Sequence, residues 1–229
     1  MTADSEITKL DDWEDEDISD LIIKLEKSFG LRFDKKAFAN VKTFGDLIEV
    51  FENHITYSHR EDCTKQQAFY RIRTAISKTQ LIDENDIQLD SELSFLFPNQ
   101  NRRQKVREFQ RLLGTDASIL TYPDWLIPIF VIGFILSLVA FSFDWKIALS
   151  GIAFFILATK IASKLGKDLS VKTVRELAEK LTREKYIDIR RIKGSVNKNE
   201  IMETIRDTFS HDLDIDRKYL TRDAKFSWA

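Results

Sequence analysis

Hydrophobic residues form one continuous block in the middle of this chain. The nineteen residues from Trp125 to Phe143 (WLIPIFVIGFILSLVAFSF) carry no formal charge. As an α-helix this run would be about 28 Å long, close to the roughly 30 Å hydrocarbon thickness of a bilayer. It is apolar on all sides instead of along one stripe, which favours lipid as its surroundings. We therefore expect a first transmembrane helix here.

A second apolar run, Ile147–Thr159, is free of charge for thirteen residues. Lys146 and Lys160 can extend their ammonium groups to the headgroups, which lengthens the usable span to Ile147–Ala162. Small residues in both runs would let the two helices approach closely: Gly133, Ser137, Ser150 and Gly151. The pattern predicts a transmembrane helical hairpin over residues 123–164. The alternative is a hairpin buried in the core of a soluble helical domain.

Positive charges flank the hairpin at its outer ends, whereas the connector holds only Lys146. The flanking residues are Arg102, Arg103, Lys105, Arg107 and Arg111 before it, and Lys160, Lys164, Lys167, Lys172 and Arg175 after it. By the positive-inside rule, both flanks and both termini are predicted to be cytoplasmic. The basic residues before the hairpin have two interpretations. Arg102, Arg103, Lys105 and Arg107 contact anionic lipid headgroups, or they serve only to set the topology.

Amphipathic patterns predict a small helical domain over residues 1–59. One helical face ends at Gly30 and consists of Ile18, Leu21, Ile22, Leu25 and Phe29. Asp34 can then cap a short turn that buries Phe38 and Val41. Thr43 and Asp46 predict a capped helix start. The inward positions of this helix are Phe44, Leu47, Ile48, Phe51 and Ile55.

Two further soluble regions follow from the same patterns. Residues 60–122 are expected to form a helical module with a helix over Cys63–Gln80 and a basic juxtamembrane helix that ends at Gly114. Residues 165–229 are expected to form a C-terminal helical segment, with one amphipathic helix over Val171–Leu181 and a brief extended stretch over Tyr186–Gly194. No long internal repeat is expected, although Thr173–Leu181 weakly echoes Thr43–Phe51.

The last predicted helix begins after Asn197, a residue that favours the N-cap position. Its apolar stripe consists of Ile201, Met202, Ile205 and Phe209. Seven glycines and three prolines in 229 residues favour long helices over a turn-rich β fold. The fold class is therefore predicted to be all-α.

The charge of the chain indicates which classes of partner it could bind. The 35 basic and 37 acidic residues leave a net charge of −2, which argues against a general nucleic-acid binder. A single cysteine, Cys63, cannot form an intramolecular disulfide and is typical of a reduced compartment. The first twenty residues contain nine acids against one base, Lys9: Asp4, Glu6, Asp11, Asp12, Glu14, Asp15, Glu16, Asp17 and Asp20. Such a run is either a solvated tail or an interaction surface.

Catalytic patterns are not found in the sequence. His54, His59 and His211 lack Cys or His partners at metal-ligand spacing. Cys63 and His59 are four positions apart and would share a face on a helix, but they lack a third group to orient the histidine. We expect neither a metal nor enzymatic activity.

The stretch Ile18–Ile55 (ISDLIIKLEKSFGLRFDKKAFANVKTFGDLIEVFENHI) resembles the last three helices of an acyl carrier protein. The segments that carry the resemblance are LEKSFG, at the end of the long second helix, and TFGDLIEVF, at the start of the last one. In that family a serine at the start of the second helix bears 4′-phosphopantetheine. Here Asp15 takes its place, and an aspartate cannot form the phosphodiester, so the resemblance implies a degenerate carrier without a cofactor. The alternative is that Ser19, one helical turn later, bears 4′-phosphopantetheine.

The resemblance also implies a first helix that residues 1–10 cannot supply. The C-terminal helix near residues 199–211 looks like that missing helix. We therefore expect a circularly permuted carrier-like bundle, in which the stripe of Ile201, Ile205 and Phe209 packs on the helices within residues 17–58. The alternative is a separate C-terminal helix that packs elsewhere.

The segment from Cys63 through LSFLFP (Leu93–Pro98) to the arginine-rich helix resembles a region that follows carrier-like domains in some bacterial membrane proteins. Together these features predict a two-span protein of the bacterial cytoplasmic membrane. We expect it to be a non-catalytic interaction or scaffold protein, whose residues Asp15, Glu16, Asp17 and Asp20 meet a protein partner with a basic surface. Its other partner would be the lipid bilayer. The competing function is an acyl or aminoacyl carrier that uses Ser19.

Overall fold

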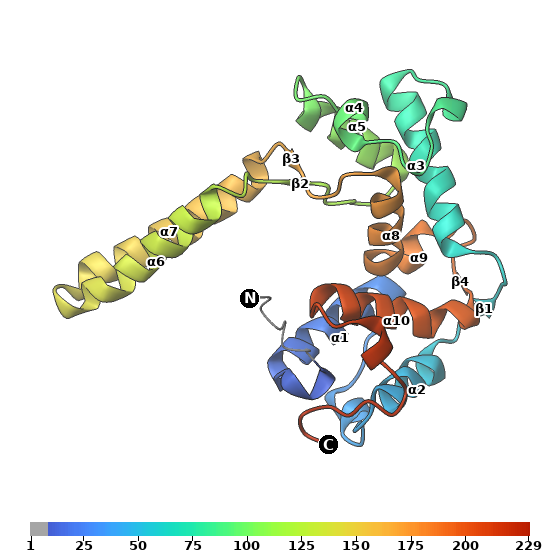
Figure 1. Ribbon diagram of the computed structural model, residues 1–229, viewed down its shortest axis with the longest axis horizontal. Coiled ribbons are helices and arrows are strands. Elements are labelled where there is room, and N and C mark those ends of the chain that lie inside the picture. The colour runs from blue at the N-terminus through green and yellow to red at the C-terminus, as the bar shows by residue number, and fades with distance from the viewer. Residues whose placement is uncertain (1–8) are drawn as a thin grey trace, which may run out of the picture. The chain divides into compact units, whose positions relative to one another are not determined.

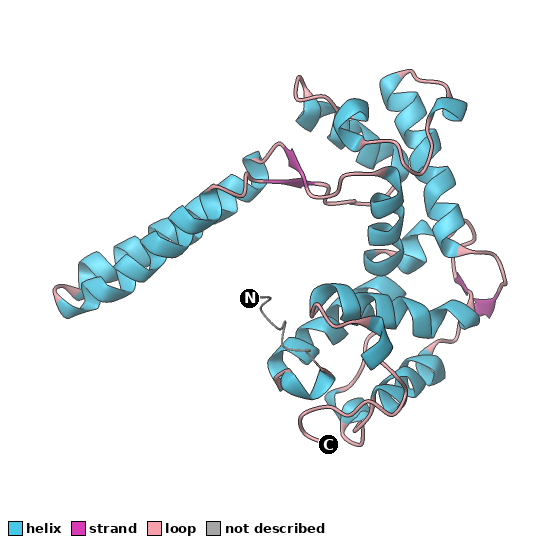
Figure 2. Ribbon diagram, in the orientation of Figure 1, coloured by secondary structure: helices cyan, strands magenta, loops and turns pink. Residues whose placement is uncertain are grey.

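The computed structural model describes residues 9–229, apart from the side chains of Lys35, Ser163 and Lys164. Asp4 and Glu6 of the acidic run lie outside the described residues. Helices make up most of the described chain, and its strands are two residues long (Figure 2). The prediction of an all-α fold is confirmed. The helices are α1 (Asp15–Phe29), α2 (Phe44–His54), α3 (Thr64–Gln80), α4 (Leu93–Leu96), α5 (Arg102–Leu113), α6 (Leu126–Val139), α7 (Trp145–Leu165), α8 (Val174–Glu184), α9 (Tyr186–Ile189) and α10 (Lys198–Asp212).

Short elements connect these helices. The 3₁₀ turns are η1 (Leu10–Asp12), η2 (Lys35–Phe38), η3 (Glu84–Asp86), η4 (Ala140–Ser142) and η5 (Arg217–Tyr219). Strand β1 (Ser58–His59) pairs in parallel with β4 (Ser195–Val196). Strand β2 (Leu120–Thr121) pairs with β3 (Asp168–Leu169) in the antiparallel sense. The chain divides into two compact units, one formed by residues up to Ile72 together with Ala178–Ala229, the other by Arg73–Leu177.

Helix α1 of the first unit ends where the sequence predicts and buries the predicted face, except that Ile22 is only partly buried. It ends at Gly30, which adopts the left-handed conformation with φ of 63° and donates its N–H to the carbonyl of Glu26. Glycine is favoured in this conformation because it has no Cβ to clash with the backbone. Ile18, Leu21 and Leu25 are buried on its inner side. The first-turn acids therefore point to solvent.

Helix α2 begins with the predicted capping box. The Thr43 hydroxyl accepts from the N–H of Asp46 at 3.1 Å, while the Asp46 carboxylate accepts from the N–H groups of Thr43 and Lys42 at 2.8 and 2.9 Å. These bonds satisfy backbone donors that have no partner within the helix. All five predicted inward positions of this helix, from Phe44 to Ile55, are buried.

Helix α10 packs against α1 and α2, as Figure 1 shows. Ile201, Ile205 and Phe209 are buried in the same hydrophobic core as Leu21, Leu25 and Phe51. The rings of Phe44 and Phe209 meet edge to face with centroids 5.2 Å apart. The contact that the sequence predicts between this stripe and the N-terminal helices is therefore present. The alternative, a helix that packs elsewhere, is excluded.

The extended stretch predicted over Tyr186–Gly194 is wrong. Its first part forms the short helix α9, and the strand that follows, β4, begins only at Ser195. Tyr186 and Ile189, three positions apart, are both fully buried in the first unit. Only a helical turn brings residues at this spacing to the same side of the backbone.

In the second unit, α5 ends at Gly114 as predicted, with φ of 77°. The ring of Phe109 on α5 meets that of Phe97 at a centroid distance of 5.4 Å. Helices α6 and α7 of this unit run alongside each other and are joined by a tight connector (Figure 1). Asp144 caps α7 by accepting the N–H of Lys146 at 2.8 Å.

The close approach of α6 and α7 depends on three of the four predicted small residues, whereas Ser150 is exposed and does not take part. A Cβ at Gly133 would lie 2.1 Å from the ring of Phe155, and one at Gly151 would lie 2.5 Å from the Ser137 hydroxyl. Ser137 instead donates to the carbonyl of Gly133 at 2.8 Å. Both glycines therefore allow this close packing.

The two apolar helices differ in length from the prediction. Helix α6 has 14 residues and continues only as the three-residue turn η4, whereas α7 has 21. Within the described chain, one window, Trp145–Ala162 of α7, is long and apolar enough to cross a membrane by length and composition. The run expected to form the stronger span thus forms the shorter helix.

Candidate functional site

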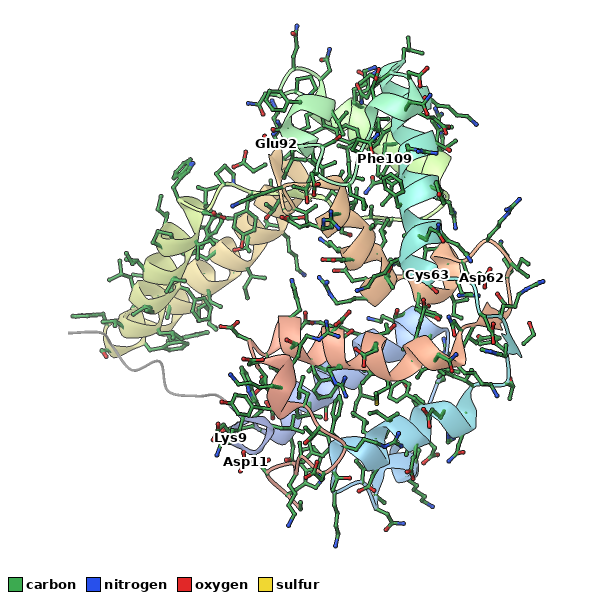
Figure 3. The ribbon with its side chains drawn as sticks, turned by 45° about the vertical axis from the view of Figure 1, so that its right-hand side comes forward. Lys9, Asp11, Asp62, Cys63, Glu92 and Phe109 are labelled. Carbon is green, nitrogen blue, oxygen red and sulfur yellow. The ribbon has the colours of Figure 1, made fainter. Side chains whose placement is uncertain are left out.

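The acidic end of α1 is the first candidate site. It consists of exposed carboxylates on η1 and on the first turns of α1: Asp11, Asp12, Glu14, Asp15, Glu16, Asp17 and Asp20. Leu10 packs into the hydrophobic core, where it is 2% exposed, and so holds η1 against it. Figure 3 shows Lys9 and Asp11 next to each other beside the start of α1. The fold therefore concentrates negative charge at one solvent-facing edge, where it can act on a partner through the field of the whole cluster.

A shallow hollow opens beside these carboxylates. It is lined by residues of η1 and α1 and by one residue from the other end of the chain: Asp11, Asp12, Trp13, Glu14, Asp15, Glu16 and Ser227. The Ser227 hydroxyl donates to the carbonyl of Trp13 at 2.8 Å. This bond fixes the C-terminal end of the chain beside the start of α1.

The two positions considered for a prosthetic group both lie on α1. Asp15 is its first residue, and its carboxylate cannot form a phosphodiester. Ser19 is exposed, one turn further into the helix, and Asp20 follows it directly.

The basic helix α5 forms the second candidate site, but its four predicted lipid contacts are not equivalent. Arg102 is only 7% exposed, and its guanidinium donates to the carbonyls of Phe97 at 2.6 Å and Lys167 at 2.8 Å. Lys105 donates to the carbonyl of Thr79 at 2.9 Å, at the C-terminal end of α3. Arg107 is exposed. Because Arg102 is used inside the protein, contact with lipid headgroups remains a prediction for Arg103, Lys105 and Arg107.

The bond between Arg102 and Lys167 ties α5 to the chain just after α7. The β2–β3 pair lies at the same place, and Ser170 donates its N–H to the carbonyl of Ile119 at 2.9 Å. Backbone pairing and a buried arginine thus join the base of the two apolar helices to the rest of the second unit.

The two apolar helices are the third candidate site, since they expose large hydrophobic side chains. Those more than half exposed include Trp125, Leu136, Phe143, Trp145, Ile147, Phe154 and Leu157. Small residues face inward while large apolar ones face outward, which is the reverse of a water-soluble helical pair. Continuous exposed apolar surfaces of this kind mark sites of contact with a membrane or a protein.

The sequence analysis missed a buried arginine. Arg190 is 2% exposed, and its guanidinium donates to the hydroxyls of Thr64 at 2.7 Å and Ser195 at 3.1 Å, and to the carboxylate of Asp62. Burial raises the pKa of Asp62, but the charge and hydrogen bond of Arg190 outweigh it, so that this pKa lies below its ordinary value. Asp62 and Cys63 precede α3, as Figure 3 shows.

This cluster continues to Tyr186 and Glu200. The Tyr186 hydroxyl donates to the Glu200 carboxylate at 3.1 Å, and the same carboxylate accepts from the hydroxyl of Thr64 at 2.6 Å. Burial of the Tyr186 ring raises the pKa of its hydroxyl above the ordinary value. These side chains fix the two segments that carry β1 and β4, which is a structural role. The double arginine in YIDIRRIKG was the available signal, but the partner Asp62 is 128 positions away.

The histidines and the cysteine lie in different parts of the fold, with His54 in α2, His59 in β1 and Cys63 before α3. The helical Cys63–His59 pair that the spacing allows is not formed, because His59 lies in β1 and Cys63 precedes α3. His59 accepts the N–H of Lys198 at 3.2 Å instead, and His54 is bonded to the carbonyl of Val50 at 2.8 Å. Among the described residues, no group of three or more His, Cys, Asp or Glu side chains could hold a metal ion.

Comparisons with protein-family models, with curated proteins and with solved structures gave no match to this chain.

Proposed function

We propose that this protein is a membrane-anchored, non-catalytic interaction protein that presents a degenerate acyl-carrier-like domain to cytoplasmic partners. The observation that carries the proposal is the apolar pair α6–α7. Its inner side is closed by Gly133, Ser137 and Gly151, whereas most of its large hydrophobic side chains are exposed. Lipid is the surrounding that makes this arrangement stable.

The proposed anchor consists of both helices. The window Trp145–Ala162 would be about 27 Å long as a helix, while Leu126–Ser142 would be about 25 Å long, which a tilted or locally thinned bilayer accommodates. The positive flanks would hold both termini in the cytoplasm. Trp125 precedes α6 and Trp145 begins α7, and tryptophan at the ends of membrane helices favours the membrane interface.

The carrier-like domain would be the bundle of α1, α2 and α10. Its support is the predicted packing of α10 on the two other helices, together with the resemblance of Ile18–Ile55 to the last three carrier helices. Carrier proteins meet their partner enzymes through the acidic face of the second helix. Asp15, Glu16, Asp17 and Asp20 would form that surface here, for a protein with a basic patch.

Membrane attachment is tested by fractionation of cells that express the full chain. We expect the protein to remain with membranes after an alkaline carbonate wash and to require detergent for extraction. A monomeric protein that is soluble without detergent would contradict the proposal. It would instead favour the buried hairpin.

The partner surface is tested by pulldown from cytoplasmic extract with the detergent-solubilised chain. Reversal of two charges on α1, Asp17→Lys with Asp20→Lys, should abolish capture at low salt, and added salt should weaken capture by the unchanged protein. The control reverses two exposed acids elsewhere, Glu52→Lys with Asp86→Lys, and should retain capture. Binding that is insensitive to both salt and the α1 reversal would count against this surface.

The competing carrier function has one supporting observation, the exposure of Ser19 on α1. It is tested by intact-mass measurement after incubation with coenzyme A and a phosphopantetheinyl transferase. We expect no gain in mass. A gain of one phosphopantetheine that disappears in Ser19→Ala would replace the proposed function with a carrier function.

A further inference from the structure

We propose that this chain contains two copies of one helical module, interleaved in the sequence. Module 1 consists of α1, α2, α10 and the segment after α10. Module 2 consists of α3, the segment after it, α5 and α8. The inference goes beyond the proposed function and does not rest on it, because it follows from backbone hydrogen bonds within each module.

The segments after α10 and α3 have the same turns. Each begins with a residue in the left-handed conformation, Asp214 with φ of 53° and Leu81 with φ of 58°. An aspartate then caps a three-residue 3₁₀ turn: Asp216 accepts the N–H of Lys218 at 3.1 Å, and Asp83 accepts the N–H of Asn85 at 2.7 Å. Non-glycine residues rarely adopt the left-handed conformation, so its occurrence at equivalent places is informative.

The same segments then pair with the start of another helix. In module 1, Phe226 donates its N–H to the carbonyl of Lys42 at 3.1 Å, and Phe44 donates to Ala224 at 2.8 Å. A third bond runs from the N–H of Gly45 to the carbonyl of Arg222 at 2.7 Å.

Module 2 repeats each of these bonds. Leu93 donates to Lys172 at 2.8 Å and Val174 to Ser91 at 3.1 Å, and the third bond runs from Arg175 to Leu89 at 2.8 Å. An isolated antiparallel bridge accompanies the bonds in both modules, Thr43 with Lys225 and Glu92 with Thr173. The two backbone patterns correspond atom for atom.

The helices that receive these segments begin in the same way. Thr173 accepts the N–H of Glu176 at 3.2 Å, and the Glu176 carboxylate accepts the N–H of Lys172 at 2.7 Å. The Thr43–Asp46 capping box of α2 makes the same contacts. The preceding tripeptide Val-Lys-Thr is identical at 41–43 and 171–173. The weak echo between these two helices is thus one part of a longer repeat.

The equivalence holds with a constant separation in sequence. From the α10 and α3 helices through the paired segments, equivalent residues lie 133 positions apart, as Asp216 and Asp83 do. Several equivalent pairs are identical: Ile205 and Ile72, Arg206 and Arg73, Ser210 and Ser77, Ile215 and Ile82, Ser227 and Ser94. Ser210 and Ser77 even donate the same bond, to the carbonyls of Ile215 and Ile82, both at 2.7 Å.

The remaining helices of the two modules also correspond. Helices α1 and α5 both end at a left-handed glycine, Gly30 and Gly114. Only the turn η2 separates Gly30 from the cap of α2, whereas the whole apolar pair α6–α7 separates Gly114 from the cap of α8. The apolar pair is therefore an insertion into module 2.

The order of the elements explains the interleaving. In module 2 the chain runs directly from Ser94 through α4 into α5. In module 1 the chain does not run from the equivalent residue, Ser227, into α1. A hydrogen bond from the Ser227 hydroxyl to the carbonyl of Trp13 joins the two segments instead. The surfaces of the two equivalent helices have diverged in charge, since α1 exposes acids where α5 carries arginines. The two equivalent helices thus carry surface charge of opposite sign.

A circular permutant of the full chain tests the duplication. Ala229 is joined to Met1 by a short Gly/Ser linker, and new termini are opened between Lys193 and Gly194, where a Cβ on Gly194 would meet nothing within 4 Å. Both modules then become continuous in sequence. We expect cooperative urea unfolding in detergent with a midpoint no lower than that of the parent chain. The control has the same linker but is opened between Asp90 and Ser91, inside module 2. Its urea unfolding should be less cooperative, with a midpoint below that of the parent chain.

Hydrogen exchange of the unpermuted protein supplies a second measurement. The amides of Leu93 and Arg175 should be protected at least tenfold over exposed loop amides, as should their equivalents Phe226 and Gly45. Rapid exchange at Leu93 and Arg175 would overturn the proposal. It would also be overturned if the two permutants unfolded alike, or if only the permutant opened at Gly194 lost cooperativity.

Discussion

The hydroxyl of Ser227 lies 2.8 Å from the carbonyl oxygen of Trp13, across 214 positions of sequence. Next to it, the indole N–H of Trp228 donates to the carbonyl of Val41 at 2.9 Å, and its ring stacks on Phe226 at 4.5 Å. The last residues of the chain therefore complete the core that its first helices begin. They should be as important for stability as any internal segment.

Truncation of Phe226 tests this contribution. The side chain is 2% exposed in the core of the first unit. Phe226→Ala should lower the free energy of unfolding by about 3–5 kcal/mol, because it removes apolar contacts and leaves a cavity. Urea titration in detergent measures the change. The exposed neighbour provides the control, and Lys225→Ala should stay within about 0.5 kcal/mol of the parent.

Removal of Asp62 should be more harmful than removal of an acid whose partner is exposed. The side chain of Asp62 is 42% exposed, but Asp62→Ala leaves the fully buried guanidinium of Arg190 without its counter-charge, which should cost about 1–3 kcal/mol. Asp90, paired with Arg175, is 83% exposed in its side chain, and Asp90→Ala should cost less than about 1 kcal/mol. Equal losses in urea unfolding would show that the Arg190 cluster contributes no more than a surface pair.

The capping box of α2 predicts a pH dependence of stability. Hydrogen bonds from the N–H groups of Lys42 and Thr43 hold the pKa of Asp46 below its ordinary value. An aspartate with a lowered folded pKa stabilises the protein fully above its unfolded pKa of about 3.9, and this contribution disappears as the pH falls through the folded pKa. Asp46→Ala should cost about 1 kcal/mol at pH 7 and less near pH 3. Urea midpoints that differ equally at the two pH values would refute this role.

Close packing of the apolar helices predicts strong sensitivity at Gly133. A methyl group there would overlap the Phe155 ring, so Gly133→Ala should force α6 and α7 apart and lower the thermal midpoint in detergent by several degrees. Ala153 lies exposed on the same pair of helices. Ala153→Val should leave the midpoint within about one degree, and a similar loss at both positions would mean that the helix contact is not close.

Two arginines of α5 are expected to have different roles, Arg107 in binding lipid headgroups and Arg102 in stabilising the fold. Arg107→Glu should weaken binding to vesicles with anionic headgroups and leave urea unfolding unchanged, because the side chain is exposed. Arg102→Gln should instead destabilise the protein, since it removes buried bonds to the carbonyls of Phe97 and Lys167. Flotation of the detergent-free protein reconstituted with neutral or anionic vesicles provides the comparison. An unchanged preference for anionic vesicles in Arg107→Glu would leave the helix with only a topological role.

Local signals predicted much of the helical structure. Gly30, Asp34, Thr43, Gly114 and Asn197 end or cap helices and turns where the sequence places them, because each acts through its own backbone conformation or through N–H groups within a few residues. The apolar stripe of α10 was also sufficient to predict its contact with α1 and α2. A stripe of this length must be buried against a complementary one.

Other features depended on distant partners. No local sequence pattern indicates that Arg190 is buried. Its burial is possible only because Asp62 and Thr64 approach it from another part of the chain. The sequence analysis did not find the repeat because it consists mainly of backbone hydrogen bonds, which are compatible with many different side chains. In addition, the segments of module 1 are far apart in the sequence.

The sequence by itself determined where several helices begin or end, which faces are apolar, and that the middle of the chain contains two long apolar runs. These properties depend on residues within one or two helical turns. Only the tertiary structure decided which segments complete each module, that Arg102 and Arg190 lie inside the protein, and that α6 is shorter than its apolar run. Such outcomes depend on contacts between residues far apart in sequence, whose free energies no local pattern encodes.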